Sequence, residues 1–184
     1  MRSAQAEWRG GYGVLRALCL LVAGLLAHSG LASDSAGASA KSARADSIRI
    51  AGAVEHPATW RLADLKRQPA TTETVSLKTG KGVLSGSYTG VALWTLLQQA
   101  AIKSPPGSKN DVLRHTLVVT SSDGYTAVLS AAEIDPEFGD DRAIIAYAKD
   151  GQPLSDARGF ARLILPADKS AGRAISGVAS ITVR

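Results

Sequence analysis

TTETVSLKTGKGVLSGSYTGVALWTLLQQAAI, residues 71–102, contains both kinds of element from which we expect the fold to be built. Residues 71–79 alternate polar with apolar or β-branched side chains, which predicts a half-buried strand. Residues 80–82 form a turn, and residues 83–87 return as a second strand. From residue 90 onward the apolar side chains recur at helical spacing, which predicts a helix over residues 90–102. A β hairpin followed by a helix indicates a domain of the α+β class.

The remainder of the chain adds more strands and only short helical segments. Alternating or continuous apolar runs predict strands at residues 47–54, 115–121, 125–130, 143–148, 161–166 and 175–183. Residues 122–124 have the composition of a hairpin turn, and Ser130 with Glu133 has the spacing of a helix capping box. We therefore predict an α+β fold with a mixed, largely β core and a few short helices.

The N-terminal residues have the composition of an export signal. Arg2, Arg9 and Arg16 precede an apolar run over residues 17–27, and small residues follow up to Ala32. This order is typical of a cleaved signal peptide. The alternative is a membrane anchor, but a span needs about 20 apolar residues and this run is shorter.

Three segments follow from this division of the chain. We predict a signal peptide over residues 1–32, a flexible Ser/Ala-rich linker over residues 33–46, and one folded domain over residues 47–184. No consecutive arginine pair precedes the apolar run, so the expected route is the general secretory one. The predicted location is therefore the periplasm or the exterior of the cell.

The charge and the rare residues of the chain exclude several classes of protein. Without residues 1–32 the chain keeps 18 basic and 15 acidic side chains, a net charge of +3, and the basic ones are scattered. This pattern does not indicate nucleic-acid binding. Cys19, inside the signal, is the only cysteine. His56 and His115 lack metal-ligand spacing, so we expect structural or surface roles for both and no metal ligands.

Three places in the sequence are candidates for binding a ligand. Residues 121–125 supply hydroxyl groups, backbone N–H groups, a carboxylate and an aromatic ring. Residues 88–90 supply an aromatic ring and a hydroxyl just before the predicted helix, whose N-terminus attracts anions. Arg162 lies in an apolar strand, so its charge needs either an internal carboxylate or a ligand. The candidate residues are Tyr88, Thr89, Gly90, Ser121, Ser122, Asp123, Gly124, Tyr125 and Arg162.

Other segments that look like binding or catalytic motifs are better explained as ordinary turns and loops. Residues 78–82 lack the spacing of a phosphate-binding loop and predict a hairpin tip. Residues 135–141 are acidic but lack the ligand spacing of a calcium loop, which predicts a solvated loop. Asp123 and Asp168 could each be a base, but carboxylates in turns are far more often turn formers. We therefore predict no catalytic residue.

The ordered set of segments resembles a known family. The segments are residues 50–54 with Pro57, 88–91 with Leu93, 96–97, 122–125, 146–147 with 150–151, 159–166 and 178–183. In this order they resemble the sulfite-oxidase fold, the molybdopterin-binding domain of oxidoreductases, over nearly all of residues 47–184. The resemblance implies a sulfite-oxidase-like fold and a pterin or molybdopterin as the ligand.

The chain departs from the catalytic members that it resembles. Those members bind molybdenum through a cysteine in the stretch that here reads VSLKTGKGV, residues 75–83, and no cysteine is present there. A hydroxyl such as that of Ser76 is a poor replacement for a thiolate. The Lys-Trp pair usual near the end of the family's domain is replaced here by Ser176 and Gly177. We therefore expect no metal.

Three functions are compatible with this resemblance. The first is an exported module that binds a pterin without molybdenum catalysis and relays the bound state to a membrane signalling protein. Small proteins similar to this one have such a role, with a membrane sensor or an enzyme of cyclic-di-GMP metabolism as the partner. The second is a molybdopterin-dependent oxidoreductase, and the third is a structural partner of a membrane complex. The lost cysteine favours the first.

Overall fold

The computed structural model describes residues 44–139, 141–154 and 157–184. The predicted signal peptide and the predicted linker up to residue 43 lie outside the described residues. The described residues belong to one unit, Ser39–Arg184. Packing begins before the predicted domain start at Ser47, because Ala45 is buried and its N–H donates to the Arg158 carbonyl at 2.8 Å. In the described part of the chain, no helix has the length and apolar character that a membrane span needs.

The first sheet joins the two ends of the domain. Its strands are β1 (Ile48–Gly52), β2 (Ala58–Trp60), β5 (Thr116–Ser121), β6 (Thr126–Ser130) and β10 (Val178–Val183), in the order β2-β1-β10-β5-β6. β1 and β10 run parallel, while the β1–β2, β10–β5 and β5–β6 pairs are antiparallel. Along β5 and β6 buried residues alternate with less buried ones, as expected for strands with one face on a core.

The second sheet contains the hairpin predicted from residues 71–87. β3 (Thr71–Thr79) and β4 (Gly82–Ala92) pair antiparallel from Thr71 with Gly90 to Thr79 with Gly82. β7 (Ile144–Lys149) pairs with β4, and both β8 (Gln152–Pro153) and β9 (Arg162–Ile164) pair with β7. The predicted strand over residues 161–166 is thus shorter than expected, but Arg162 does lie within it.

The helices are short, and the longest begins later than predicted. They are α1 (Leu62–Leu65), α2 (Leu93–Ala100), α3 (Ala131–Ile134) and the 3-10 turns η1 (Asp111–Arg114) and η2 (Ala171–Arg173). Residues 90–92 remain in β4 because they pair with β7. The helix prediction over residues 90–102 is therefore wrong at its start. At the start of α3, Ser130 and Glu133 form the predicted capping box.

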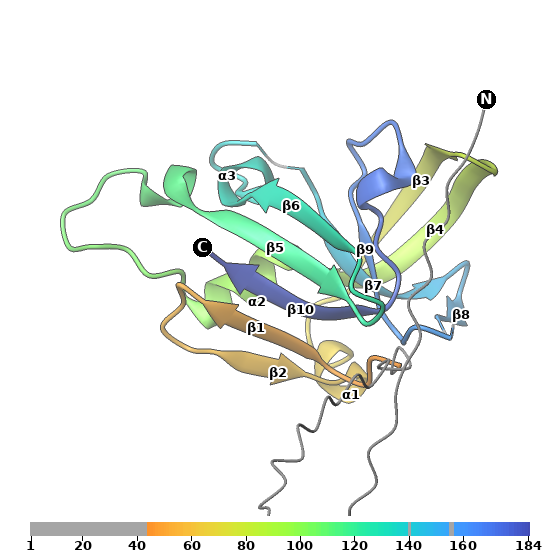
Figure 1. Cartoon of the computed structure of the whole chain (residues 1–184), viewed down its shortest axis with the longest axis horizontal. Helices are drawn as coiled ribbons and strands as arrows, with labels where there is room; N and C mark the ends of the chain where they lie inside the picture. Colours follow the sequence, from red (N-terminus) through yellow and green to blue (C-terminus); the bar gives the residue numbers. More distant parts are fainter. Residues whose placement is uncertain (1–43, 140, 155–156) are drawn as a thin grey trace, which may run out of the picture. The chain divides into compact units, whose positions relative to one another are not determined.

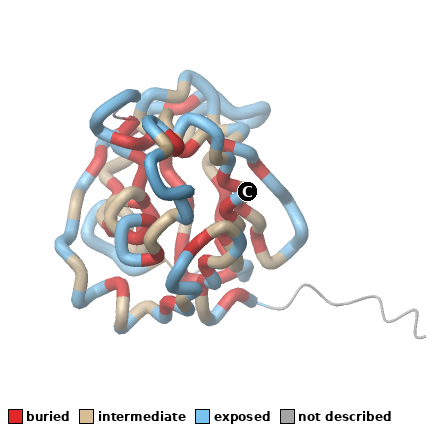
Figure 2. Tube along the Cα trace, turned by 90° about the vertical axis from the view of Figure 1, so that its left-hand side faces the viewer, coloured by how far each residue is buried: buried red, intermediate tan, exposed pale blue. Residues whose placement is uncertain are grey.

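The core lies between the two sheets. Its largest cluster combines Leu117 and Ile181 of the first sheet with Val91 and Ile145 of the second. α2 adds its apolar face to this cluster, and Figure 1 shows it behind β1 and β10. A smaller cluster, which includes Tyr88, lies on the second sheet. In Figure 2 the buried segments run through the interior and the exposed ones through the peripheral loops.

Two carboxylates of the acidic loop are buried, which corrects the prediction of a solvated loop over residues 135–141. Asp135 is 5% and Asp141 is 7% exposed. Asp135 accepts the Glu137 N–H at 2.9 Å and closes a turn. Among the described residues neither Asp141 oxygen accepts a hydrogen bond of full geometry, although the Ala167 N–H lies close enough to interact with the carboxylate. Burial raises the pKa of Asp141, and the Ala167 N–H offsets only part of this effect.

Candidate ligand-binding site

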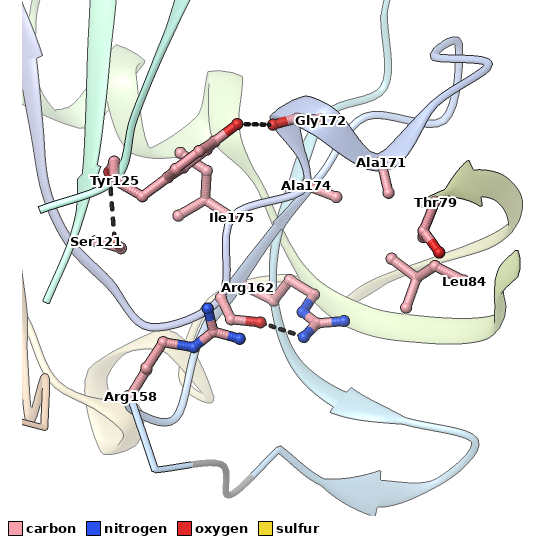
Figure 3. Close-up of a pocket in the computed structure, with 11 residues that line it drawn as sticks. Thr79, Leu84, Ser121, Tyr125, Arg158, Arg162, Ala171, Gly172, Ala174 and Ile175 are labelled. Atoms are coloured by element: carbon pink, nitrogen blue, oxygen red, sulfur yellow. Dashed lines mark hydrogen bonds between the residues drawn. The ribbon is translucent and has the colours of Figure 1, made fainter. Parts of the chain in front are cut away.

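A cavity of about 310 Å³ opens beside the second sheet (Figure 3). It is lined by Thr79 and Leu84 of the β3–β4 hairpin, Ser121 and Tyr125 of the β5–β6 turn, Arg158 and Arg162 from around β9, and Ala171, Gly172, Ala174, Ile175 and Ser176 from η2 and the segment after it. None of these described lining residues is acidic, and two are arginine. The cavity therefore favours a ligand with negative charge or hydrogen-bond acceptors.

Asp123 stabilises the β5–β6 turn at the edge of this cavity. The Ser121 hydroxyl and the Tyr125 N–H both donate to its Oδ1. These hydrogen bonds hold the pKa of Asp123 below its usual range, so the carboxylate is ionised at neutral pH. Its Oδ2 lies 3.4 Å from Nη1 of Arg158. Asp123 is thus a turn former that also orients an arginine of the cavity wall.

Arg158 lies before β9 and Arg162 is the first residue of β9, and both side chains line the cavity. Arg162 is half-buried and donates to the Ser176 hydroxyl, and its Nη1 lies 3.5 Å from the Tyr88 hydroxyl. Figure 3 shows the guanidinium groups of Arg158 and Arg162 directed into the space below the Tyr125 ring. Arg162 therefore combines structural contacts with a place on the cavity wall.

Tyr125 connects the β5–β6 turn with η2 across the cavity. Its side chain is 55% exposed, and its hydroxyl donates to the Gly172 carbonyl at 2.7 Å (Figure 3). The ring is thus held in a fixed orientation with one part open to solvent. A flat ligand could pack against it, and a contact of this kind contributes about 0.5–1.5 kcal/mol beyond burial.

The segment that carries η2 is attached to two further parts of the domain. Arg173 donates to Asp168 at 2.6 Å and to Glu133 of α3 at 2.8 Å. These two carboxylates raise the pKa of Arg173, so its charge is permanent. The Ser170 hydroxyl donates to the Lys78 carbonyl of β3 at 3.2 Å. Asp168, expected from the sequence to be a turn former, instead pairs with Arg173 and anchors this wall of the cavity.

The structure brings together some of the predicted site residues and separates others. Ser121, Tyr125 and Arg162 line one cavity. Ser122 lies behind the wall, where its hydroxyl donates to the Arg158 carbonyl at 2.8 Å. Gly124 supplies the positive φ of 85° that the turn between β5 and β6 requires.

Residues 88–90 are placed differently from the prediction. They lie inside β4, so they are not at the N-terminus of α2. Tyr88 is 0% exposed and does not line the cavity, so its ring cannot stack on a ligand there. It reaches the site only through its hydroxyl and Arg162. Thr89 pairs with Thr72 across the sheet at 2.9 Å, and Gly90 lies against β7, where a Cβ would come 2.1 Å from the Ile145 carbonyl.

The sequence reasoning missed Arg158 and the whole η2 wall. Arg158 directly precedes residues 159–166, one of the segments that carry the family resemblance. Its position next to that segment is the signal that could have made it a candidate site residue. The residues of and after η2 that line the cavity are small or apolar, and Arg173, the charged residue of η2, is not among the lining residues. Ser176, noted in the sequence only as a departure from the family, accepts a hydrogen bond from Arg162.

The side chains of the cavity wall limit which groups the cavity could hold. The described lining residues offer hydroxyl and guanidinium groups and no thiolate. Hydroxyl oxygens are poor substitutes for a cysteine ligand to molybdenum. A flat ring with acceptor atoms, by contrast, matches an aromatic face beside two guanidinium groups.

The two sheets and the arginine-lined cavity define a small α+β domain of the sulfite-oxidase type. The chain belongs to the family of oxidoreductase molybdopterin binding domains, whose model matches residues 37–183. This family and the α+β fold class confirm the resemblance drawn from the sequence.

A solved structure supports the same fold. The chain is similar to the sulfane dehydrogenase SoxCD from Paracoccus pantotrophus, with a TM-score of 0.60 and 22% sequence identity over 74% of this chain. It spans only 37% of the SoxCD chain, so the likeness concerns the fold of one part of that protein. The comparison with curated proteins gives no match.

Proposed function

We propose that this domain binds a pterin in the cavity beneath Tyr125, as a binding module without molybdenum catalysis of its own. The observation that carries the proposal is the composition of the cavity wall. Two arginines and an oriented tyrosine ring surround a hollow of about 310 Å³ in a domain of the molybdopterin-binding family. Ligand sites of small molecules are about 300–1,000 Å³ in volume, so a bicyclic ring can enter.

Each group of the wall has a distinct role in this proposal. The Tyr125 ring covers one face of the pterin. Arg158 and Arg162 donate to the ring carbonyl or to an anionic tail, as planar guanidinium groups do for such acceptors. The hydroxyls of Ser121 and Ser176 lie beside them in the wall. Asp123 does not line the cavity and acts through its contact with Arg158.

A molybdopterin-dependent oxidoreductase is the second candidate. Membership of the family favours this candidate, because the family is that of the molybdopterin binding domains of oxidoreductases. In that case the cofactor would supply the redox chemistry, and Arg158, Arg162 and Tyr125 would hold its pterin part. The first candidate is preferred because the mature chain has no cysteine to hold the metal.

The partner and the location remain part of the proposal. An exported pterin-binding module without chemistry of its own can act by relaying whether its ligand is bound. We infer a periplasmic or secreted protein whose partner is a membrane sensor or an enzyme of cyclic-di-GMP metabolism. What supports the location is the order of charged, apolar and small residues over residues 1–32, which is typical of an export signal. The partner is inferred only from the resemblance drawn from the sequence.

Calorimetric titration with neopterin, in its oxidised and tetrahydro forms, tests the ligand. We expect binding to the wild type, and a loss of at least about tenfold in affinity in Arg158→Ala, since a hydrogen bond to a charged group is worth about 1.5–3 kcal/mol. Lys81→Ala is the control, because Lys81 is an exposed cation outside the cavity wall. Thermal melts of each variant check that it remains folded.

Two results would decide against the first candidate. If neither form of neopterin produces heat on titration, the cavity does not bind a free pterin. If protein purified from its native host contains stoichiometric molybdenum by elemental analysis, the oxidoreductase becomes the preferred function.

A further inference from the structure

A second hollow lies around Trp94, away from the arginine-lined cavity. Trp94 is half-buried on α2 and lines two cavities of about 350 and 460 Å³. The first lies between α2, η1 and the loop after α3, and the second lies between α2, the start of β3 and the segment before β7. We call the two cavities together the Trp94 groove. The groove shares no lining residue with the site proposed for the pterin.

The first cavity of the groove has an apolar and aromatic wall. Leu97, Ile102, Val112 and Phe138 line it together with Trp94. Phe138 is 43% exposed, so a large aromatic side chain at the rim is in contact with water. An aromatic ring at the rim of a hollow offers contact area to a bound molecule.

The charges on this cavity are all negative. Asp111, Asp135 and Glu137 line it, and no lysine or arginine is among its described lining residues. Burial raises the pKa of Asp111, but hydrogen bonds from His115 and Ser108 outweigh burial and hold it below the usual range. Asp111 is therefore ionised at neutral pH, and the first cavity has the opposite charge preference to the arginine-lined cavity.

The second cavity shares Trp94 with the first. Glu73, only 6% exposed, lies in its wall and pairs with Arg142 at 3.4 Å. The Arg142 side chain is itself 67% exposed, so it can turn toward solvent when another cation approaches. A single small amine would fill one cavity and leave the other empty, whereas a peptide chain can place side chains in both.

We propose that the Trp94 groove docks a basic segment of a protein partner in which arginine or lysine is flanked by apolar residues. The cationic side chain lies over the Trp94 ring and near the carboxylates, where aromatic and electrostatic attraction act together. An apolar neighbour covers Phe138. Tryptophan at the centre of a contact and charge at its rim are the usual arrangement of interfaces. This inference does not depend on which ligand the arginine-lined cavity takes.

The test uses the full chain and a random-peptide display library. Selection on the wild type should enrich sequences with a basic residue next to apolar ones. Calorimetry with the most enriched synthetic peptide then compares the wild type with Glu137→Lys and Phe138→Ser. We expect each variant to lose at least about tenfold in affinity, as hot-spot positions do.

Asp46→Lys is the matched charge reversal at an exposed residue outside the groove, and it should change the affinity by less than about twofold. Enrichment of peptides without basic residues would overturn the proposal. Equal weakening by Asp46→Lys would also overturn it, because the attraction would then be one of net charge only. If arginine methyl ester alone competes as well as the peptide, the groove is a small-molecule site and the partner is not a protein.

Discussion

At the scale of single residues, each arginine of the ligand site is fixed by a different kind of contact. Arg158 lies 3.4 Å from a carboxylate oxygen of Asp123, whose own geometry is set by the β5–β6 turn. Arg162 is oriented by the hydroxyls of Ser176 and Tyr88. Hydroxyl partners orient a guanidinium group through its planar fork of donors, which a lysine cannot reproduce.

Replacing Arg162 by lysine tests this orientation. Arg162→Lys keeps the charge but loses the planar guanidinium group, which can donate to Ser176 and to a ligand in the cavity at the same time. We therefore expect the affinity for the pterin to fall at least about tenfold. Calorimetric titration measures the change, with Lys81→Ala as the reference. A variant that binds as tightly as the wild type would mean that Arg162 contributes charge alone.

Asp141 gives a pH dependence of stability. Its pKa is raised in the folded protein above the ordinary value of 3.8, so folding favours its protonated form. The stability that this group contributes is complete below its unfolded pKa and is lost as the pH rises through the folded value. Asp141→Asn cannot ionise and should therefore be more stable than the wild type at neutral pH, by about 1 kcal/mol.

Urea denaturation of Asp141→Asn at several pH values checks this expectation. The advantage of the variant should shrink as the pH falls through the raised pKa of the folded protein, because the wild-type carboxyl then becomes protonated as well. Asp46→Asn, at an exposed position, should show no such trend. A variant that is less stable at neutral pH would show that the carboxylate has a favourable partner.

At the scale of elements, the contact between β4 and β7 determines where the helix α2 can begin. Gly90 pairs with Ala146 and lies so close to β7 that a Cβ there would overlap the Ile145 carbonyl. The strand therefore continues to Ala92, and its last residues are fixed by sheet hydrogen bonds. The helical spacing of apolar residues from residue 90 cannot override this pairing, since sheet packing outweighs local propensity.

Gly90→Ala tests the close approach of the two strands. The added methyl group would lie 2.1 Å from a backbone oxygen, which cannot move without displacing β7. We expect a loss of about 2–4 kcal/mol in the free energy of unfolding. Gly80→Ala at the hairpin tip meets nothing within 4 Å and should change it by less than about 0.5 kcal/mol. Urea titration of both variants measures the difference, and equal stabilities would contradict the packing described here.

At the scale of the whole domain, one ion-pair network connects the ligand site with the rest of the fold. Arg173 joins η2, which lines the cavity, to Glu133 of α3. α3 leads directly into the loop of Asp135 and Phe138, which lines the Trp94 groove. The two proposed binding surfaces are therefore connected through a short, continuous set of described contacts.

Arg173→Ala removes the centre of this network. It leaves Glu133 and Asp168 without their common cation, so we expect a loss of about 1–3 kcal/mol in the free energy of unfolding and weaker pterin binding. Arg67→Ala breaks an exposed pair with Asp64 and should cost no more than about 1 kcal/mol. Urea denaturation and calorimetry separate the two effects. Unchanged affinity in Arg173→Ala would show that the η2 wall does not shape the site.

The sequence by itself determined the types of element and their turns. The alternation in residues 71–79, the turn at residues 122–124 and the capping box of Ser130 and Glu133 all have counterparts in the structure. These signals are local, because periodicity and turn chemistry depend on neighbours within a few residues. The ordered motifs also identified the family. The sequence alone shows that no cysteine follows Cys19.

Only the tertiary structure decided which of those residues meet. Strand pairing buried Tyr88, which the sequence offered as a ring for a ligand, and brought Arg158 to Asp123 across 35 residues of chain. It also made the η2 segment a wall of the cavity by joining Arg173 to Glu133, 40 residues apart. Burial and proximity of this kind depend on long-range sheet pairing, and no local pattern in the chain encodes that pairing.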